Sequence, residues 1–226
     1  MIEIQNLSKH YGNKIVLRNI NLRFDIGQVY GIVGENGAGK TSFFKCLSGL
    51  EKYSGNIRSN YAKLKDEIGF LPTTPYFFPK ITGREYLQLL CNARNIKTPD
   101  FDKKNIFDLP LEQYATTYST GMKKKLALLG LLMQQNQVLI LDEPFNGVDI
   151  QSNLLITEII HQLKKLDKTI LISSHIFSSL QETCDEIHLL KTGQIVRSVR
   201  EAEFVQLEQE MKDFSIGNSI EKLDLK

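Results

Sequence analysis

The sequence contains no tryptophan, only six prolines and three cysteines, and no long apolar run. A helix needs about 18–20 apolar residues to cross a bilayer, and the longest run, Leu126 to Met133, is far shorter. The N-terminus enters strand-like residues at once, without the charged leader and apolar core of a signal peptide. Cys46, Cys91 and Cys184 are odd in number and follow no ligand spacing, which favours small core residues in a reducing cytosol. The sequence therefore predicts a soluble cytosolic protein.

An excess of charge of either sign is also absent. The 28 Lys and Arg residues nearly balance the 26 Asp and Glu residues, giving a net charge of +2. Nothing in this balance calls for nucleic acid or an anionic membrane as a partner. With 226 residues, 42% of them hydrophobic, the chain can bury a full core. We expect one domain with an inserted lobe, and the sequence contains no internal repeat.

One glycine-rich stretch, residues 34–41, has the spacing of a phosphate-binding loop: glycine, four residues, then Gly-Lys-Thr. Glycines permit positive φ and carry no Cβ, so the backbone N–H groups of such a loop can surround a polyphosphate. Lys40 supplies positive charge for the β- and γ-phosphates, and the Thr41 hydroxyl can ligate Mg²⁺. We expect the nucleotide to contact Gly34, Glu35, Asn36, Gly37, Ala38, Gly39, Lys40, Thr41 and Ser42.

The flanking residues support this interpretation of the loop. Val29–Val33 has the pattern of a short buried strand, and residues 41–50 have the pattern of a helix. The N–H groups and dipole of that helix would then face the phosphates. A glycine-rich turn with a surface lysine is the plain alternative, but a strand before and a helix after argue against it. The sequence predicts that the chain binds a nucleoside triphosphate.

Apolar patterning elsewhere predicts an α/β core. Residues 137–141 form a continuous apolar run typical of a central parallel strand, and Asp142 and Glu143 follow at its carboxyl end. Open α/β sheets build their sites at that edge. The other predicted strands are two within 2–24 joined by a turn at 11–13, one within 52–60, then 67–71, 169–173 and a hairpin over 186–199. The other predicted helices are 85–95, 123–134, 151–166 and 177–184.

Residues 82–135 are expected to form a helical insert between strands. Thr82 and Glu85 have the spacing of a capping box at its first helix, and residues 98–110 are expected to be a polar connection. The loop before it, residues 72–79, carries three adjacent aromatics, Tyr76, Phe77 and Phe78. They either pack locally or form a contact surface. Beyond residue 201 the chain is polar and is expected to be a C-terminal tail.

Several motifs together resemble the ATP-binding-cassette (ABC) ATPases. Residues 118–122, Tyr-Ser-Thr-Gly-Met, are similar to the signature motif of that family, usually Leu-Ser-Gly-Gly-Gln. Residues 138–142 resemble its Walker B strand, and residues 146–149 resemble its D-loop. Glu143, His175 and Tyr11 match the catalytic glutamate, the switch histidine and the A-loop aromatic. The resemblance extends from residue 2 to about residue 199, in the family's order and spacing.

The resemblance implies a fold: a P-loop NTPase fold of the ABC type, with a mixed sheet, an N-terminal antiparallel portion and an inserted helical subdomain. It also implies roles. Asp142 would hold Mg²⁺ opposite Thr41, and Glu143 would orient or deprotonate the attacking water. His175 would reach the γ-phosphate, and Tyr11 would stack on the nucleobase. Ser119 and Gly121 would form an anion site facing a partner subunit's nucleotide, so that two chains enclose two ATP molecules head to tail.

The chain departs from the family pattern in two places. Where the family presents a glutamine to the metal and the attacking water, this chain has Thr73, or Thr74 if the register shifts by one. A threonine hydroxyl has a shorter reach, so a bridging water would be needed. In the signature, Thr120 and Met122 replace glycine and glutamine. These changes bear on hydrolysis rate and coupling more than on nucleotide binding.

The function implied is the ATP-hydrolysing subunit of a membrane transporter, favouring export. Its partners would be an integral membrane permease and a second copy or paralogue of the chain, with no nucleic acid. It would lie in the cytoplasm, on the inner face of the membrane. The alternative is a soluble ABC ATPase with a regulatory or translation-associated role. Residues 1–226 are expected to form one cassette without the long coiled coils or second cassette of non-transport members.

Overall fold

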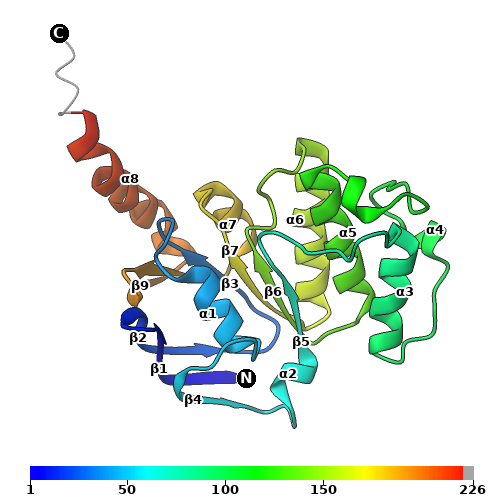
Figure 1. Cartoon of the computed structure of the whole chain (residues 1–226). Coiled ribbons are helices and arrows are strands. Elements are labelled where there is room, and N and C mark those ends of the chain that lie inside the picture. The colour runs from blue at the N-terminus through cyan, green and yellow to red at the C-terminus, as the bar shows by residue number, and fades with distance from the viewer. Residues whose placement is uncertain (221–226) are drawn as a thin grey trace.

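The computed structural model describes residues 1–220 and the side chains up to residue 212. Two sheets form the framework (Figure 1). The smaller sheet is antiparallel, with strand order β2 (Lys14–Phe24), β1 (Ile2–Tyr11) and β4 (Ser54–Ser59). It confirms the predicted N-terminal antiparallel portion.

The larger sheet has six strands in the order β5-β6-β7-β3-β8-β9. All neighbours in it are parallel except the β8–β9 pair, so the sheet is mixed, as predicted. Its strands are β5 (Ile68–Leu71), β6 (Val138–Asp142), β7 (Thr169–Ser173), β3 (Val29–Val33), β8 (Glu186–Lys191) and β9 (Gln194–Arg200).

Burial on both faces explains why the central strands are continuous apolar runs. Every residue of β3, β6 and β7 is buried. Along β3, Val29 and Val33 join one hydrophobic cluster, while Tyr30 and Ile32 join the other. The second cluster also contains Phe43 of helix α1 (Lys40–Leu47), which the two sheets enclose (Figure 1). The phosphate-loop helix is therefore fixed by burial on its two sides.

Helices α6 (Ile150–Lys165) and α7 (Phe177–Thr183) contribute to the other cluster, on the opposite face of the large sheet. Between β5 and β6 the chain forms α3 (Gly83–Ala93), α4 (Phe101–Lys104), a short 3₁₀ turn at Ala115–Thr117 and α5 (Thr120–Met133). The Thr82–Glu85 capping box at α3 is present in full. These helices gather beside β5 and β6 (Figure 1).

Two short helices correct the sequence-based expectations. Helix α4 lies inside residues 98–110, which we expected to be only a connection; the Asp100 side chain caps it by accepting from the Lys103 N–H. Helix α2 (Leu64–Glu67) ends at Glu67, a residue that we expected to begin the next strand. Such single turns are too short to show a helical hydrophobic period.

The C-terminal part also differs from expectation. The β8–β9 turn at Thr192-Gly193 was predicted, and both residues have positive φ, 46° and 80°, as a type I′ hairpin turn requires. The polar segment after residue 201 is not simply a tail, because residues Phe204–Ile220 form helix α8, anchored by the buried Phe204 and Leu207. Arg197 of β9 pairs with Glu203 and Glu210. Residues 221–226 of the predicted tail lie outside the described residues.

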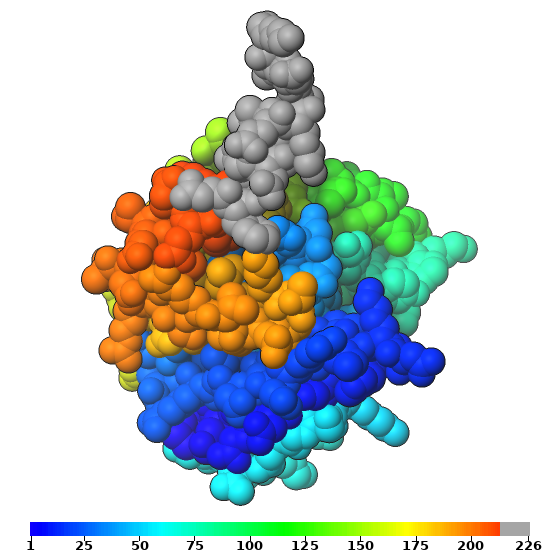
Figure 2. Space-filling model, turned by 90° about the vertical axis from the view of Figure 1, so that its left-hand side faces the viewer, coloured from blue at the N-terminus to red at the C-terminus, as the bar shows by residue number. Residues whose placement is uncertain are grey.

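The hairpin also joins the two sheets. Arg18 of β2 donates its N–H to the carbonyl of Gly193 at 2.8 Å. Figure 2 shows the resulting continuous face, with the C-terminal strands (orange) against the N-terminal strands (blue). None of the helices in the described part of the chain is both long and apolar enough to span a membrane.

Buried His188 on β8 makes the fold sensitive to acid. Its Nδ1 lies 2.7 Å from the Ser198 hydroxyl and 3.7 Å from a Glu186 carboxylate oxygen, and its ring stacks on Tyr30. Burial lowers the pKa of His188 from 6.5 to about 4. The unfolded chain therefore binds a proton at a higher pH than the folded chain does, and stability falls as the pH drops from 6.5 towards 4.

We expect His188→Gln to remove this part of the acid sensitivity. A shift of this size corresponds to at most about 3 kcal/mol. Urea unfolding of both proteins at pH 7 and pH 4.5 measures it: the wild type should lose more stability than the variant. Equal losses in the two proteins would assign the acid sensitivity to carboxylates instead.

Candidate functional site

The candidate site lies where the carboxyl ends of β3, β6 and β7 meet the start of α1. A cavity of about 600 Å³ opens there. It brings together sequence-predicted residues from the phosphate loop, from the loop after β5 and from the end of β6. Its lining residues are Lys14, Ile15, Val16, Arg18, Asn36, Gly37, Gly39, Lys40, Thr41, Ser42, Thr73, Asp142, Glu143, Thr192 and Gly193.

The phosphate loop has the conformation that its glycines permit. Gly39 adopts φ of 113° at the helix N-cap, a left-handed conformation that side chains disfavour. A Cβ on Gly34 would lie 2.2 Å from the carbonyl oxygen of Leu190, which leaves no room for a side chain. The buried ammonium of Lys40 donates to the Gly34 carbonyl at 2.7 Å and to the Glu35 carbonyl at 3.3 Å. The lysine is thus held at the mouth of the loop.

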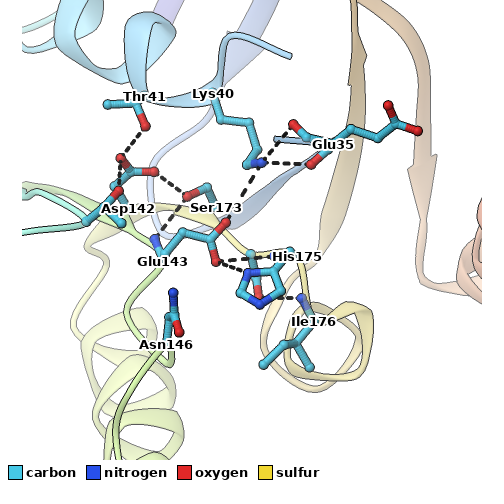
Figure 3. A network of polar contacts seen from close by, with 12 residues as sticks. Glu35, Lys40, Thr41, Asp142, Glu143, Asn146, Ser173, His175 and Ile176 are labelled. Carbon is cyan, nitrogen blue, oxygen red and sulfur yellow. Dashed lines mark hydrogen bonds and ion pairs between the residues drawn. The ribbon is translucent and has the colours of Figure 1, made fainter. Parts of the chain in front are cut away.

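Asp142 is fully buried and accepts hydrogen bonds from three hydroxyl groups (Figure 3). Thr41 and Thr73 each donate to its Oδ2 at 2.7 Å, and Ser173 donates to its Oδ1 at 2.5 Å. Of the two registers left open by the sequence, Thr73 is therefore the residue next to Asp142. A carboxylate with two hydroxyls is a set of hard oxygen ligands, which suits Mg²⁺.

Glu143 directly follows and points towards the side chains of His175 and Lys40 (Figure 3). Its Oε2 lies 2.7 Å from His175 Nδ1 and accepts the His175 backbone N–H at 3.3 Å. Its Oε1 lies 3.8 Å from the Lys40 ammonium. The Glu143 backbone has φ of 55°, in the sparsely populated left-handed region. Residues other than glycine are strained in this conformation. Strain of this kind gathers at functional sites.

Outside the phosphate loop, four sequence-predicted residues do not line this cavity: His175, whose ring contacts Glu143 instead, and Tyr11, Ser119 and Gly121. Tyr11, at the end of β1, has the Lys9 ammonium 4.5 Å from its ring centre. Ser119 caps α5 by accepting from the Met122 N–H at 3.2 Å. A Cβ on Gly121 would lie 2.7 Å from the Gly147 carbonyl oxygen. Their proposed roles towards a nucleobase or a partner's nucleotide stay predictions.

Gly34, Glu35 and Ala38, also predicted to contact the nucleotide, line a second cavity of about 640 Å³ with Asn36 and Gly37. That cavity lies between the phosphate loop, the β8–β9 turn and Met211 of α8. The phosphate loop thus forms a wall of both cavities. The sequence analysis missed the α8 side of this loop, because the polar tail showed no helical pattern.

Two further residues of the site were missed. Ser173 bonds Asp142 and also accepts the Glu143 N–H at 3.0 Å. Its place at the end of a buried strand was a usable signal, since neighbouring parallel strands end together. Lys124 donates from α5 to the Glu143 carbonyl at 2.7 Å. A central lysine in a run of three gives no such signal.

The strand–loop–helix of β3 and α1, with an aspartate at the end of β6, a parallel strand of the same sheet, defines a P-loop nucleotide-binding protein. The family model described as "ABC transporter" matches residues 17–146. The chain therefore belongs to the ABC transporter family, as an ATP-binding subunit with ATPase activity. The fold class predicted from the sequence is confirmed.

Similar proteins agree with this assignment. The chain is 32% identical to the "Bacitracin transport ATP-binding protein BcrA" of Enterococcus faecalis, over 96% of this chain and 75% of that protein. It is 33% identical to the "Lantibiotic transport ATP-binding protein SrtF" of Streptococcus pyogenes, over 87% and 89%. A solved dimeric structure, the ATP-binding cassette MJ0796 bound to ADP and Pi, shares the fold with a TM-score of 0.79 at 19% identity, over 89% and 99%.

Lys40→Ala should weaken ATP binding by at least about tenfold, because it removes a charge-assisted hydrogen bond to the phosphates. A titration with fluorescent ATP measures the dissociation constant. Lys45→Ala, on the last turn of the same helix, is the matched control and should bind ATP as the wild type does. Equal affinity of the Lys40 variant and the control would contradict the assignment of the loop.

Proposed function

We propose that the chain binds ATP with Mg²⁺ in the 600 Å³ cavity and uses its hydrolysis to drive a separate membrane subunit that exports a substrate. The observation that supports this best is the convergence of Lys40, Thr41, Asp142 and Glu143 on one cavity. They come from two segments that lie about 100 residues apart in the sequence, and a purely structural polar cluster would not place a lysine in a glycine-rich loop beside two adjacent carboxylates.

Binding of the phosphates falls to the loop and Lys40. The backbone N–H groups of residues 37–41 and the N-terminus of α1 surround the polyphosphate, and the ammonium moves from the loop carbonyls to the phosphate oxygens. Asp142, Thr41 and Thr73 supply the oxygen ligands that would hold Mg²⁺. When bound, the ion neutralises charge on the phosphate oxygens.

Water activation falls to Glu143. Its carboxylate accepts the proton of the attacking water as the oxygen of that water adds to the γ-phosphorus and ADP leaves. His175, 2.7 Å away, orients this carboxylate through Nδ1. The Lys40 ammonium lies 3.8 Å from the other carboxylate oxygen of Glu143. Its positive charge stabilises the negative charge that develops on the reacting phosphate. The place of Glu143 in the cavity lining supports this role.

A second copy or a paralogue completes the site in this proposal. Ser119 caps α5, so its hydroxyl and the first N–H groups of the helix form the surface offered to the partner's nucleotide, together with Gly121. The MJ0796 cassette, whose solved structure is dimeric, supports dimerisation. In the same arrangement Tyr11 stacks on the nucleobase.

The two transport proteins BcrA and SrtF support a membrane partner. We place the chain in the cytoplasm, held at the inner face of the membrane by that partner. Names of this kind favour transport over a translation-associated role. The cargo would be a compound related in chemistry to those that BcrA and SrtF are named for.

Glu143→Gln should retain ATP binding but lower turnover by at least about a hundredfold, because an amide cannot accept a proton from water. Phosphate release by the purified chain with its membrane partner measures turnover. The unhydrolysed ATP should then hold two chains together, and size-exclusion chromatography should show a dimer. Glu158→Gln, an exposed residue on α6, is the matched control and should hydrolyse ATP normally. Wild-type turnover in the Glu143 variant would exclude it as the base.

The aromatic loop offers a surface for the membrane subunit. Phe77 is buried and packs on Tyr86 with ring centres 4.7 Å apart. Tyr76 and Phe78 are 73% and 57% exposed and contact each other edge to face at 5.8 Å. Thus one aromatic packs locally and two lie on the surface. The loop begins at Thr73, so ATP-driven movement at Asp142 would reach it.

Replacing both Tyr76 and Phe78 with Ala should weaken binding to the membrane subunit by at least about tenfold, since exposed aromatics act as interface hot spots. Co-purification and ATP binding by the isolated chain are measured together, and ATP binding should stay intact. Leu166→Ala, at an exposed apolar residue after α6, is the control. Normal membrane-subunit binding by the double variant would place the coupling surface elsewhere.

A further inference from the structure

Lys124, on the helix that Ser119 begins, is a buried lysine that the proposed chemistry does not use. Its side chain is 2% exposed. No carboxylate oxygen lies within 4 Å of its ammonium in the described part of the chain. The ammonium instead donates to two backbone carbonyls, of Glu143 at 2.7 Å and of Asn146 at 2.8 Å. Burying a charge is costly, and replacing such a group with an apolar side chain often stabilises a protein. Stability alone therefore gives no reason for a lysine here.

The two carbonyls belong to the turn that carries the proposed base. The Glu143 carbonyl also accepts the Asn146 N–H at 3.2 Å, which closes the turn. On the other side, the Glu143 N–H donates to the Ser173 carbonyl and hydroxyl. The peptide groups before and after Glu143 are thus each bonded, by β7 and by α5. Such bonds are what a residue at φ of 55° requires to stay in place.

The first turns of α5 contact this segment at two further points. Gly121 is so close to Gly147 that a Cβ would lie 2.7 Å from its carbonyl oxygen. The Lys125 ammonium lies 3.1 Å from the Asp149 carboxylate. Gly121 and Lys125 contact residues after the turn, whereas Lys124 bonds to the turn of Glu143 itself. Helix α5 and residues 143–149 therefore form one packed unit.

We propose that Lys124 is a positioning residue: its bonds to the Glu143 and Asn146 carbonyls fix the backbone turn that aims the Glu143 carboxylate at the attacking water. This inference rests on the proposed role of Glu143 as the base. Because Lys124 sits on the helix that starts at Ser119, engagement of that helix end by a second copy is transmitted through Lys124 to Glu143 of the same chain.

Lys124→Met removes the donor while keeping the length of the side chain. We expect the turnover number for ATP to fall roughly a hundredfold, as misplacement of a reacting group by about 1 Å does, while the dissociation constant for ATP changes less than about threefold. Lys124→Gln retains one donor and should recover part of the rate. Lys165→Met, an exposed helical lysine on α6, is the control and should hydrolyse ATP as the wild type does.

A double variant separates positioning from a general loss of structure. If Lys124 acts through Glu143, adding Lys124→Met to Glu143→Gln should lower the residual rate by less than about twofold, because the effects are not additive. An additive loss would overturn the proposal, and so would unchanged turnover in Lys124→Met. If neither Lys124 variant folds, judged by circular dichroism, the ammonium serves the fold and the proposal is wrong. A wild-type chain without ATPase activity would instead contradict the proposed function.

Discussion

The buried carboxylate of Asp142 is the constraint on which the rest of the site depends. A carboxylate without solvent is costly unless its oxygens are hydrogen-bonded, and here three hydroxyls meet that need. Thr41 belongs to α1, Thr73 to the loop after β5, and Ser173 to β7. A single group therefore ties the phosphate loop, the aromatic loop and the centre of the large sheet to one point. Displacing any of these segments would leave part of a buried charge unsatisfied.

This arrangement also fixes how the Thr73 loop approaches the site. The Thr73 hydroxyl is on a short side chain, so its 2.7 Å bond to Asp142 requires the loop backbone to lie beside the carboxylate. The loop therefore approaches the carboxylate closely, and the following aromatics are fixed relative to it. Phe77 packs into the helical segment, which turns Tyr76 and Phe78 outwards. The loop thus links the nucleotide site at Thr73 to the exposed aromatics Tyr76 and Phe78.

Much of the fold could be predicted because buried positions require apolar residues, and their spacing along the sequence differs between strands and helices. Strands β3, β6 and β7 are continuous apolar runs, and the spacing of residues 34–41 matches that of a phosphate-binding loop. Asp142 and Glu143 could be assigned to the site because open α/β sheets build their sites at the carboxyl ends of their strands. Helix α8 could not be found in this way, since few of its described residues, Phe204, Leu207 and the partly buried Met211, pack against the core. The contacts of Ser173 and Lys124 join residues about 20 to 30 positions apart, and no local pattern records which turn folds back onto which helix.

The buried ammonium of Lys124 lies near the buried carboxylates of Glu143 and Asp142. Burial lowers the pKa of Lys124, while the nearby carboxylates of Glu143 and Asp142 raise it and favour the charged form. The carboxylates thus offset part of the cost of burying the ammonium, although no ion pair joins the lysine to either of them. Removing Lys124 would therefore alter the potential at both carboxylates as well as free the turn. The lysine from α5 and the serine from β7 act on the same peptide segment, so the position of Glu143 depends on two structural layers at once.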